Sequence, residues 1–289
     1  MSETIATTIT AVLYLAASGL VFIFGSSYYT LFRTNRSWLF KLGLVGAFAI
    51  AGGLTMRSGL EPTYGLLALA FLGAASANLV GTAAAYLHGP LGVRDDSLKG
   101  MALCKGLEAV AVVGAILAIL AIARVPLDTV YLTAGNLPLG LGIGLGGFAL
   151  FAGLAAAQGR SLKVGPRTIR RLLPWILLFV FANGFMEELW FRALFLHPMV
   201  VLVGPIAAIG LTSVVFALAH IGATYMSKEE RIRFLAILFP LGLAWGTCTY
   251  FTDSLIASTI FHAGADLMIL NGFIASMHGS NRPVSEPVT

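Results

Sequence analysis

The sequence predicts an all-α protein, a bundle of about eight or nine helices that cross a membrane. Of its 289 residues, 58% are hydrophobic and only 11% are charged, and the mean hydropathy is +0.89. A soluble domain has about 25% charged residues, so this chain lacks the polar groups that would cover a globular surface in water. Apolar runs of about 18 residues or more, the length of a membrane-spanning helix, also recur along the chain.

Nine segments are apolar enough to be membrane spans. Helices suit this role because they satisfy their own backbone hydrogen bonds inside lipid. In chain order the predicted spans are approximately residues 5–25, 38–56, 64–87, 101–123, 136–157, 172–196, 205–225, 234–251 and 254–276. Many of the 33 glycines lie inside them, as in GLGIGLGGFALFAGLAAA. Small residues let helices approach closely in lipid, so these glycines predict tight helix packing.

The lysines and arginines lie mainly on one side of this predicted bundle. Only Arg57 and Arg124 lie in the even-numbered loops, and Arg192 lies within a span. The other fifteen lie in the odd-numbered loops, the C-terminal tail and their flanks: Arg33, Arg36, Lys41, Arg94, Lys99, Lys105, Arg160, Lys163, Arg167, Arg170, Arg171, Lys228, Arg231, Arg233 and Arg282. Basic loops remain cytoplasmic, which predicts a multi-pass cell-membrane protein with its N-terminus outside and its C-terminus in the cytoplasm.

This topology leaves one alternative open. If one weak span lies at the interface, the bundle has eight helices and one terminus changes sides. The net charge of +5 comes from the loops between spans, and no nucleic-acid-binding motif accompanies it, so the bilayer and not a nucleic acid is the expected partner. Cys104 and Cys248 both lie in apolar segments and suggest neither a disulfide framework nor a zinc cluster.

The chain divides at its longest polar stretch, the basic loop predicted over residues 158–171. Residues 1–157 hold accessory N-terminal transmembrane helices with little chemistry. Residues 172–276 form the predicted catalytic core, and residues 277–289 form a C-terminal tail. We interpret the division as functional, and the two parts need not fold independently.

Ionisable side chains inside spans are energetically costly, so each is a functional hypothesis. Lys105 and Glu108 in the fourth span could pair or line a cavity. The core is richer: the sixth span contains FMEELWFR (residues 185–192), the seventh contains FALAH (residues 216–220), and the ninth contains HAGAD (residues 262–266).

The spacing of these residues along each predicted helix indicates which of them share a face. Glu188 and Arg192 are four residues apart, so they share a helix face and can form an ion pair. Glu187 points about 100° away from Glu188 and is the carboxylate that remains for chemistry. His262 and Asp266 also share a face, while His220 stands on a third helix.

Such a set can activate water. A carboxylate in an apolar site can act as a general base, and imidazoles can orient a water molecule or stabilise an oxyanion. The sequence has neither a GxSxG nucleophile motif nor an HExxH metal motif. Direct attack by water on a carbonyl is the simplest chemistry for the set. The alternative is a divalent metal such as zinc held by Glu187, His220 and His262.

The motifs EExxxR, FxxxH and HxxxN/D, in this order on separate membrane helices, resemble the CPBP family. That family includes the type II CAAX prenyl endopeptidases, related to the eukaryotic Ras-converting enzyme, and bacterial proteins linked to bacteriocin processing or immunity. The similarity covers roughly residues 170–276.

The resemblance implies a metal-free, glutamate-dependent intramembrane endopeptidase that acts on a peptide or membrane-protein substrate, which is prenylated in CAAX processing. It implies that Glu187 and His220 activate water and that His262 and Asp266 hold the substrate carbonyl and its oxyanion. Glu188 and Arg192 would be structural or tune Glu187, and Phe216 would pack beside the site.

Two positions depart from the family pattern. Asp266 stands where the third motif often has Asn, and an ionised Asp cannot donate a hydrogen bond to an oxyanion. It would have to be protonated, orient His262 or bind a metal. Ala193 stands where Gly is common, a change that concerns packing.

Two other functions use similar residues. A transporter or proton-relay protein also places Glu, His and Asp inside the membrane, but the first five predicted helices contain no repeat of the charged motifs. A non-catalytic immunity or scaffold protein of the same fold would not need the intact set of motifs.

Overall fold

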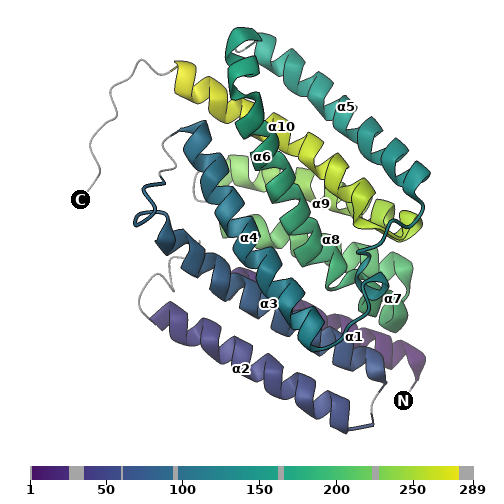
Figure 1. Ribbon diagram of the computed structural model, residues 1–289. Coiled ribbons are helices and arrows are strands. Elements are labelled where there is room, and N and C mark those ends of the chain that lie inside the picture. Colours follow the sequence, from purple (N-terminus) through teal and green to yellow (C-terminus); the bar gives the residue numbers. More distant parts are fainter. Residues whose placement is uncertain are drawn as a thin grey trace.

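The computed structural model describes residues 2–25, 36–59, 61–93, 97–161, 166–222 and 228–279, and the regular structure in these ranges is helical (Figure 1). The α-helices are α1 (Glu3–Ser18), α2 (Arg36–Arg57), α3 (Pro62–Leu87), α4 (Leu98–Ile122), α5 (Leu137–Ser161), α6 (Pro166–Glu188), α7 (Leu196–Val203), α8 (Pro205–Ala219), α9 (Lys228–Thr252) and α10 (Leu255–Gly279). Shorter helical turns are η1 (Gly19–Phe24), η3 (Asp128–Val130), η4 (Leu189–Ala193) and η5 (His220–Gly222).

The predicted membrane bundle is confirmed. Among the described residues, seven helical stretches are long and apolar enough to cross a membrane: Thr4–Phe24, Trp38–Arg57, Pro62–Leu87, Leu98–Ile122, Leu137–Gly159, Ile169–Val203 and Arg231–Thr252. Two shorter apolar helices, Pro205–Ala219 and Leu255–Asn271, correspond to the remaining two predicted spans. Large hydrophobic side chains such as Ile122 and Ile206 are more than 80% exposed, as expected of surfaces that face lipid.

Two predicted boundaries differ from the structure. Most of the stretch predicted as a basic loop, 158–171, is helical, because α5 continues to Ser161 and α6 begins at Pro166; residues 162–165 lie outside the described residues. The sixth predicted span, 172–196, is a composite of α6, the π-helical turn η4 and α7. Proline at the first position of α6 explains its start, because proline lacks the N–H that would be unpaired there.

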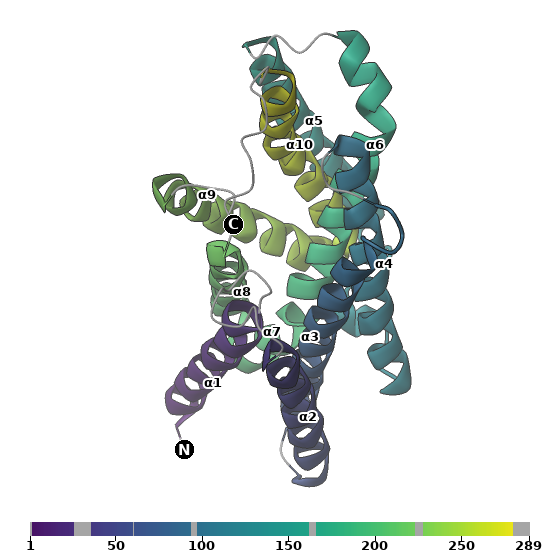
Figure 2. The same ribbon diagram turned by 90° about the vertical axis from the view of Figure 1, so that its left-hand side faces the viewer.

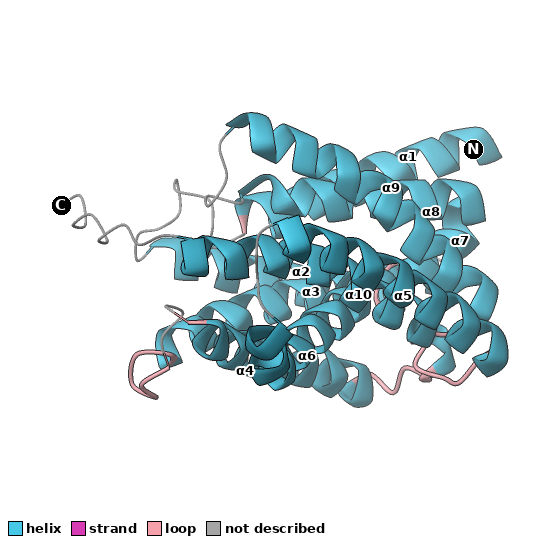
Figure 3. Ribbon diagram, turned by 90° about the horizontal axis from the view of Figure 1, so that it is seen from above, coloured by secondary structure: helices cyan, strands magenta, loops and turns pink. Residues whose placement is uncertain are grey.

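The two halves of the chain pack into one bundle. The last helix, α10, lies against α5 of the first half and against α6 and α9 of the second, and Figure 1 shows α5 and α10 side by side. The fourth helix, α4, packs along α6, and α3 packs against α7 (Figure 2). Figure 3 shows the described helices from above. Helices outside the predicted core therefore support those that carry the charged motifs.

The start of α10 is fixed by the loop that precedes α5. The Leu255 N–H donates to the Tyr131 carbonyl at 3.1 Å, and the Ser254 hydroxyl donates to the Thr133 carbonyl at 2.7 Å. The Asn136 N–H returns a bond to the Thr252 carbonyl at 2.8 Å. Two turns further along α10 lies His262, so these loop bonds help to set the position of a site residue.

Glycines bring α5, α6 and α10 into close contact, as the sequence predicts. A Cβ atom on Gly264 would lie 2.6 Å from Cα of Phe148, and one on Gly147 would lie 2.5 Å from the Phe261 ring. A Cβ on Gly184 would lie 3.2 Å from the Ala263 nitrogen. At these glycines, α5, α6 and α10 therefore approach one another so closely that an added Cβ atom would clash or nearly clash with the neighbouring helix.

We expect Gly264→Ala to destabilise the protein and to lower its activity. The new methyl group meets the backbone of Phe148, which cannot rotate away, and overpacking of this kind costs about 1–3 kcal/mol. This exceeds the roughly 1 kcal/mol that alanine gains over glycine inside a helix. Thermal unfolding in detergent measures the loss. Gly146→Ala is the control, because nothing lies within 4 Å of its Cβ position; equal unfolding temperatures for the two variants would contradict the packing account.

Candidate active site

The charged motif of α6 lies where this helix gives way to a π-helical turn. Glu187 and Glu188 end α6, and Arg192 lies in η4. Such turns are rare and are frequently found at functional sites. The predicted ion pair is present: Nη1 of Arg192 lies 3.1 Å from Oε1 of Glu188, and both side chains are completely buried.

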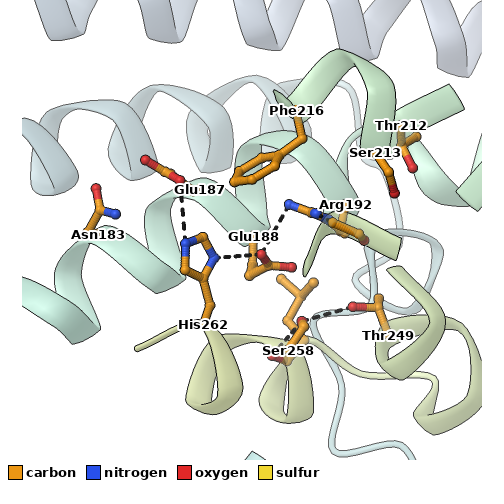
Figure 4. Close-up of polar contacts among 12 residues, drawn as sticks. Asn183, Glu187, Glu188, Arg192, Thr212, Ser213, Phe216, Thr249, Ser258 and His262 are labelled. Atoms are coloured by element: carbon orange, nitrogen blue, oxygen red, sulfur yellow. Dashed lines mark hydrogen bonds and ion pairs between the residues drawn. The ribbon is translucent and has the colours of Figure 1, made fainter. Parts of the chain in front are cut away.

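Glu188 also binds the histidine of α10. Nδ1 of His262 lies 2.8 Å from Oε1 of Glu188, and because a carboxylate accepts, this nitrogen donates its proton. Arg192 donates in addition to the Gly242 carbonyl of α9 at 3.2 Å. One buried network thus joins η4, α6, α9 and α10 (Figure 4). It fixes the His262 ring and leaves its Nε2 atom directed to the other carboxylate.

Aromatic rings enclose this network. The Trp245 ring stacks on the His262 ring with 3.8 Å between centroids and 8° between planes. The Arg192 guanidinium lies 4.4 Å from the centroid of Phe216, which also meets the His262 ring edge-on. Phe216 therefore packs beside the site, as expected. These rings exclude water from the charged groups behind them, which strengthens their electrostatic interactions.

Glu187 faces both imidazoles. Its Oε2 atom lies 3.5 Å from Nε2 of His262 and 3.8 Å from Nε2 of His220. The ring of His220 is oriented by its Nδ1 atom, which donates to the Phe216 carbonyl at 2.9 Å. This bond requires a proton on Nδ1, and the neutral ring that carries it there has a lone pair on Nε2. Oε2 of Glu187 and Nε2 of His220 are thus two neighbouring hydrogen-bond acceptors. The distance between these two atoms is one that a single water molecule can bridge.

Asp266 lies beside His262 and is held by an amide. Its Oδ1 atom lies 3.8 Å from Nε2 of His262, and its Oδ2 atom accepts a hydrogen bond from Nδ2 of Asn183 at 3.0 Å. Asn183 lies on α6, one turn before Glu187, and both Asn183 and Asp266 are buried. The structure therefore brings together Glu187, His220, His262 and Asp266, the four residues that the sequence analysis selects.

The first half of the chain adds charge to the site. Lys105 and Glu108 on α4 pair at 2.7 Å, and the Lys105 ammonium interacts electrostatically with the carboxylates of Glu187 and Asp266. An α4 residue next in sequence, Gly106, approaches the Leu178 side chain of α6. The accessory helices thus contribute a cation as well as packing.

The side chains at one edge of the site are partly exposed to solvent, and those behind them are buried. The side chains of His220 and Glu187 are 22% and 14% exposed, whereas His262 is 3% exposed and Glu188 is fully buried. Glu187 and His220 therefore form the more exposed edge of this group of side chains.

The alternative metal set was Glu187, His220 and His262. Within the described ranges, no three His, Cys, Asp or Glu side chains form a group that could hold a metal ion. The chemistry proposed for the site uses these side chains alone.

Three groups at the site were not predicted from the sequence. Trp245 and the Gly242 carbonyl come from α9, a helix without a charged motif inside its span, and nothing in their spacing indicates the site. Asn183 did carry a signal, because it is a polar residue within an apolar span, four residues before Glu187 and therefore on the same face.

This bundle, in which carboxylates and imidazoles converge, defines the chain as a polytopic membrane protein with an enclosed cluster of acidic and histidine side chains. Residues 169–268 match the family model described as type II CAAX prenyl endopeptidase Rce1-like, and this segment contains all four converging residues. These residues therefore form an Rce1-like domain of the CPBP family, which indicates an intramembrane protease. Comparison with curated proteins gave no match, and comparison with solved structures gave none either.

Proposed function

We propose that the chain is an intramembrane endopeptidase that cleaves a peptide bond with a water molecule activated by Glu187. The observation that carries the proposal is the position of Glu187, whose Oε2 atom faces Nε2 of both His220 and His262 at the half-open edge of a buried site. A carboxylate and an imidazole lone pair can each accept one proton of the same water. The oxygen lone pair then points away from both acceptors, toward a substrate carbonyl.

The hydrolysis proceeds in two steps. Water oxygen bonds to the scissile carbonyl carbon while one of its protons passes to Glu187, which gives a tetrahedral oxyanion. Glu187 then returns this proton to the amide nitrogen, and the carbon–nitrogen bond breaks to release an amine and a carboxylic acid, which then ionises in water. One residue thus serves as base and then as acid, as in other general acid–base mechanisms.

The buried groups position the reacting ones. Glu188 fixes the ring of His262 through Nδ1, and Arg192 balances the charge of Glu188. Nε2 of His262 then lies beside Glu187 and Asp266, where a proton on this nitrogen can be donated to the substrate carbonyl oxygen. Because these groups are fixed before substrate arrives, no reorganisation is needed at the moment of reaction.

We propose that substrate reaches the site from the basic side of the bundle. His220 lies directly after α8, in the connection to α9, and Nη1 of Arg231 donates to the carbonyl of the adjacent Ile221 at 3.3 Å. This connection belongs to the lysine- and arginine-rich loops, which the positive-inside rule assigns to the cytoplasm. A cytoplasmic substrate that carries a lipid chain can enter from this side.

The substrate class follows from the family description and the setting of the site. A CAAX sequence ends a protein and carries a prenyl group on its cysteine, which brings the peptide to the membrane. An enzyme with its base inside a helical bundle then meets the peptide at the lipid boundary. We therefore propose prenylated C-terminal peptides as substrates.

The test is the cleavage of a farnesylated CAAX peptide by the purified protein in detergent, followed by mass spectrometry. We expect endoproteolytic cleavage that persists in a metal chelator and is weaker for the unprenylated peptide. Complete loss of cleavage in chelator with recovery on added zinc would contradict the metal-free mechanism. No cleavage of either peptide would contradict the proposed substrate class.

A further inference from the structure

The amide of Asn183 joins the two helices that carry the acid–base residues. Asn183 on α6 is 8% exposed, and its Nδ2 atom donates to Oδ2 of Asp266 on α10 at 3.0 Å. It lies one helical turn before Glu187, and Figure 4 shows its amide nitrogen on the side where Glu187 and His262 lie. A buried amide at this point is expensive unless its hydrogen bonds are used.

The oxyanion of a tetrahedral intermediate needs N–H donors, which carboxylates lack. Arg192 is committed to Glu188 and to the Gly242 carbonyl, and it is fully buried behind the rings. Among the side chains of α6 and α10 near Glu187, two can donate an N–H: Nε2 of His262, when it carries a proton, and the amide of Asn183. An amide nitrogen has two N–H groups, and the bond to Asp266 uses one of them.

We propose that Asn183 is a catalytic residue that donates the second N–H of its amide to the oxyanion, and that Asp266 is the acceptor that holds this amide in place. The proposal rests on the proposed peptidase function. It gives Asp266 a role that an ionised carboxylate can perform, because Asp266 accepts a hydrogen bond and need not donate one. It also explains why a polar residue stands on the Glu187 face of an apolar span.

A purely structural role for Asn183 is the competing explanation, and the chain supplies a matched control. Asn271 is also a buried asparagine on a membrane helix, and its Nδ2 atom donates across a helix interface to the Ala155 carbonyl at 2.6 Å. It makes no contact with Glu187, His220 or His262 in the described structure. Asn183→Leu and Asn271→Leu therefore each remove one cross-helix amide bond, but only the first removes a donor from the site.

The experiment compares kcat, KM and thermal unfolding of both leucine variants, with farnesylated CAAX peptide, at a temperature where both remain folded. We expect Asn183→Leu to lower kcat by about 10²–10³-fold with KM nearly unchanged, because an oxyanion donor acts only in the transition state. Asn271→Leu should lower the unfolding temperature but keep kcat within about threefold, as expected for a bond that only supports packing. Equal effects of the two variants on kcat would overturn the proposal.

Isosteric exchanges decide the matter if the leucine variant does not fold. Asn183→Asp keeps the volume but removes both N–H donors, so we expect the same large loss of kcat. Asp266→Asn keeps an acceptor for Asn183 and should retain activity within about tenfold. A wild-type kcat in Asn183→Asp would overturn the proposal. A wild-type enzyme without any cleavage would instead contradict the proposed function, so the two failures are distinguishable.

Discussion

Glu187→Gln lowers kcat for peptide cleavage by about 10²–10⁴-fold, the range that a general base contributes. Glutamine preserves the size of the side chain but cannot accept a proton from water at the point shared by His220 and His262. The hydrogen bonds among Glu188, Arg192 and His262 do not involve Glu187, so the variant should insert and unfold like the wild type. Steady-state kinetics and thermal unfolding in the same detergent measure both quantities.

Glu229→Gln is the control for this prediction, because Glu229 is exposed at the start of α9. Its kcat should equal that of the wild type. If a cellular phenotype of the protein survives Glu187→Gln unchanged, the catalytic account is wrong, and a non-catalytic immunity or scaffold role on the same fold becomes the better explanation.

Arg192→Met destabilises the protein by about 3–5 kcal/mol, the cost of removing one partner from a buried ion pair. The change leaves Glu188 charged, fully buried and bound only by His262, and it also removes the bond to the Gly242 carbonyl. Denaturant unfolding in detergent measures the loss as a change in the transition midpoint at constant slope.

Two further variants check the origin of this loss. Arg167→Met removes an exposed arginine near the start of α6 and should change stability by less than about 0.5 kcal/mol. Glu188→Leu combined with Arg192→Met removes both charges, so it should be more stable than Arg192→Met alone. An Arg192→Met protein as stable as the wild type would show that the pair does not hold the site together.

Much of this architecture follows from local patterns in the sequence. The apolar runs predict the membrane helices because the bilayer fixes their length and composition. The four-residue spacing predicts that Glu188 meets Arg192 and that His262 lies near Asp266, because one helical turn brings such residues together. Both arrangements are present at 3.1 Å and 3.8 Å.

Contacts between helices could not be predicted in this way. The bond from His262 to Glu188 joins residues 74 positions apart, and the stacking of Trp245 on His262 depends on how α9 crosses α10. The π-helical turn after Glu188 interrupts the regular period on which spacing arguments depend. Asn183 could have been found, because a polar side chain on the Glu187 face of an apolar span already indicates a buried partner.

The central claim is that water attacks the substrate directly with Glu187 as its base, and cleavage in ¹⁸O-labelled water tests it. A single turnover of farnesylated CAAX peptide by excess enzyme should place one ¹⁸O atom in the new carboxylate, and Glu187→Gln should give almost no product in the same time. A first-turnover product without ¹⁸O would show that the Glu187 carboxylate itself attacks the carbonyl and gives its own oxygen to the product. Either that result or wild-type cleavage by Glu187→Gln would contradict the mechanism.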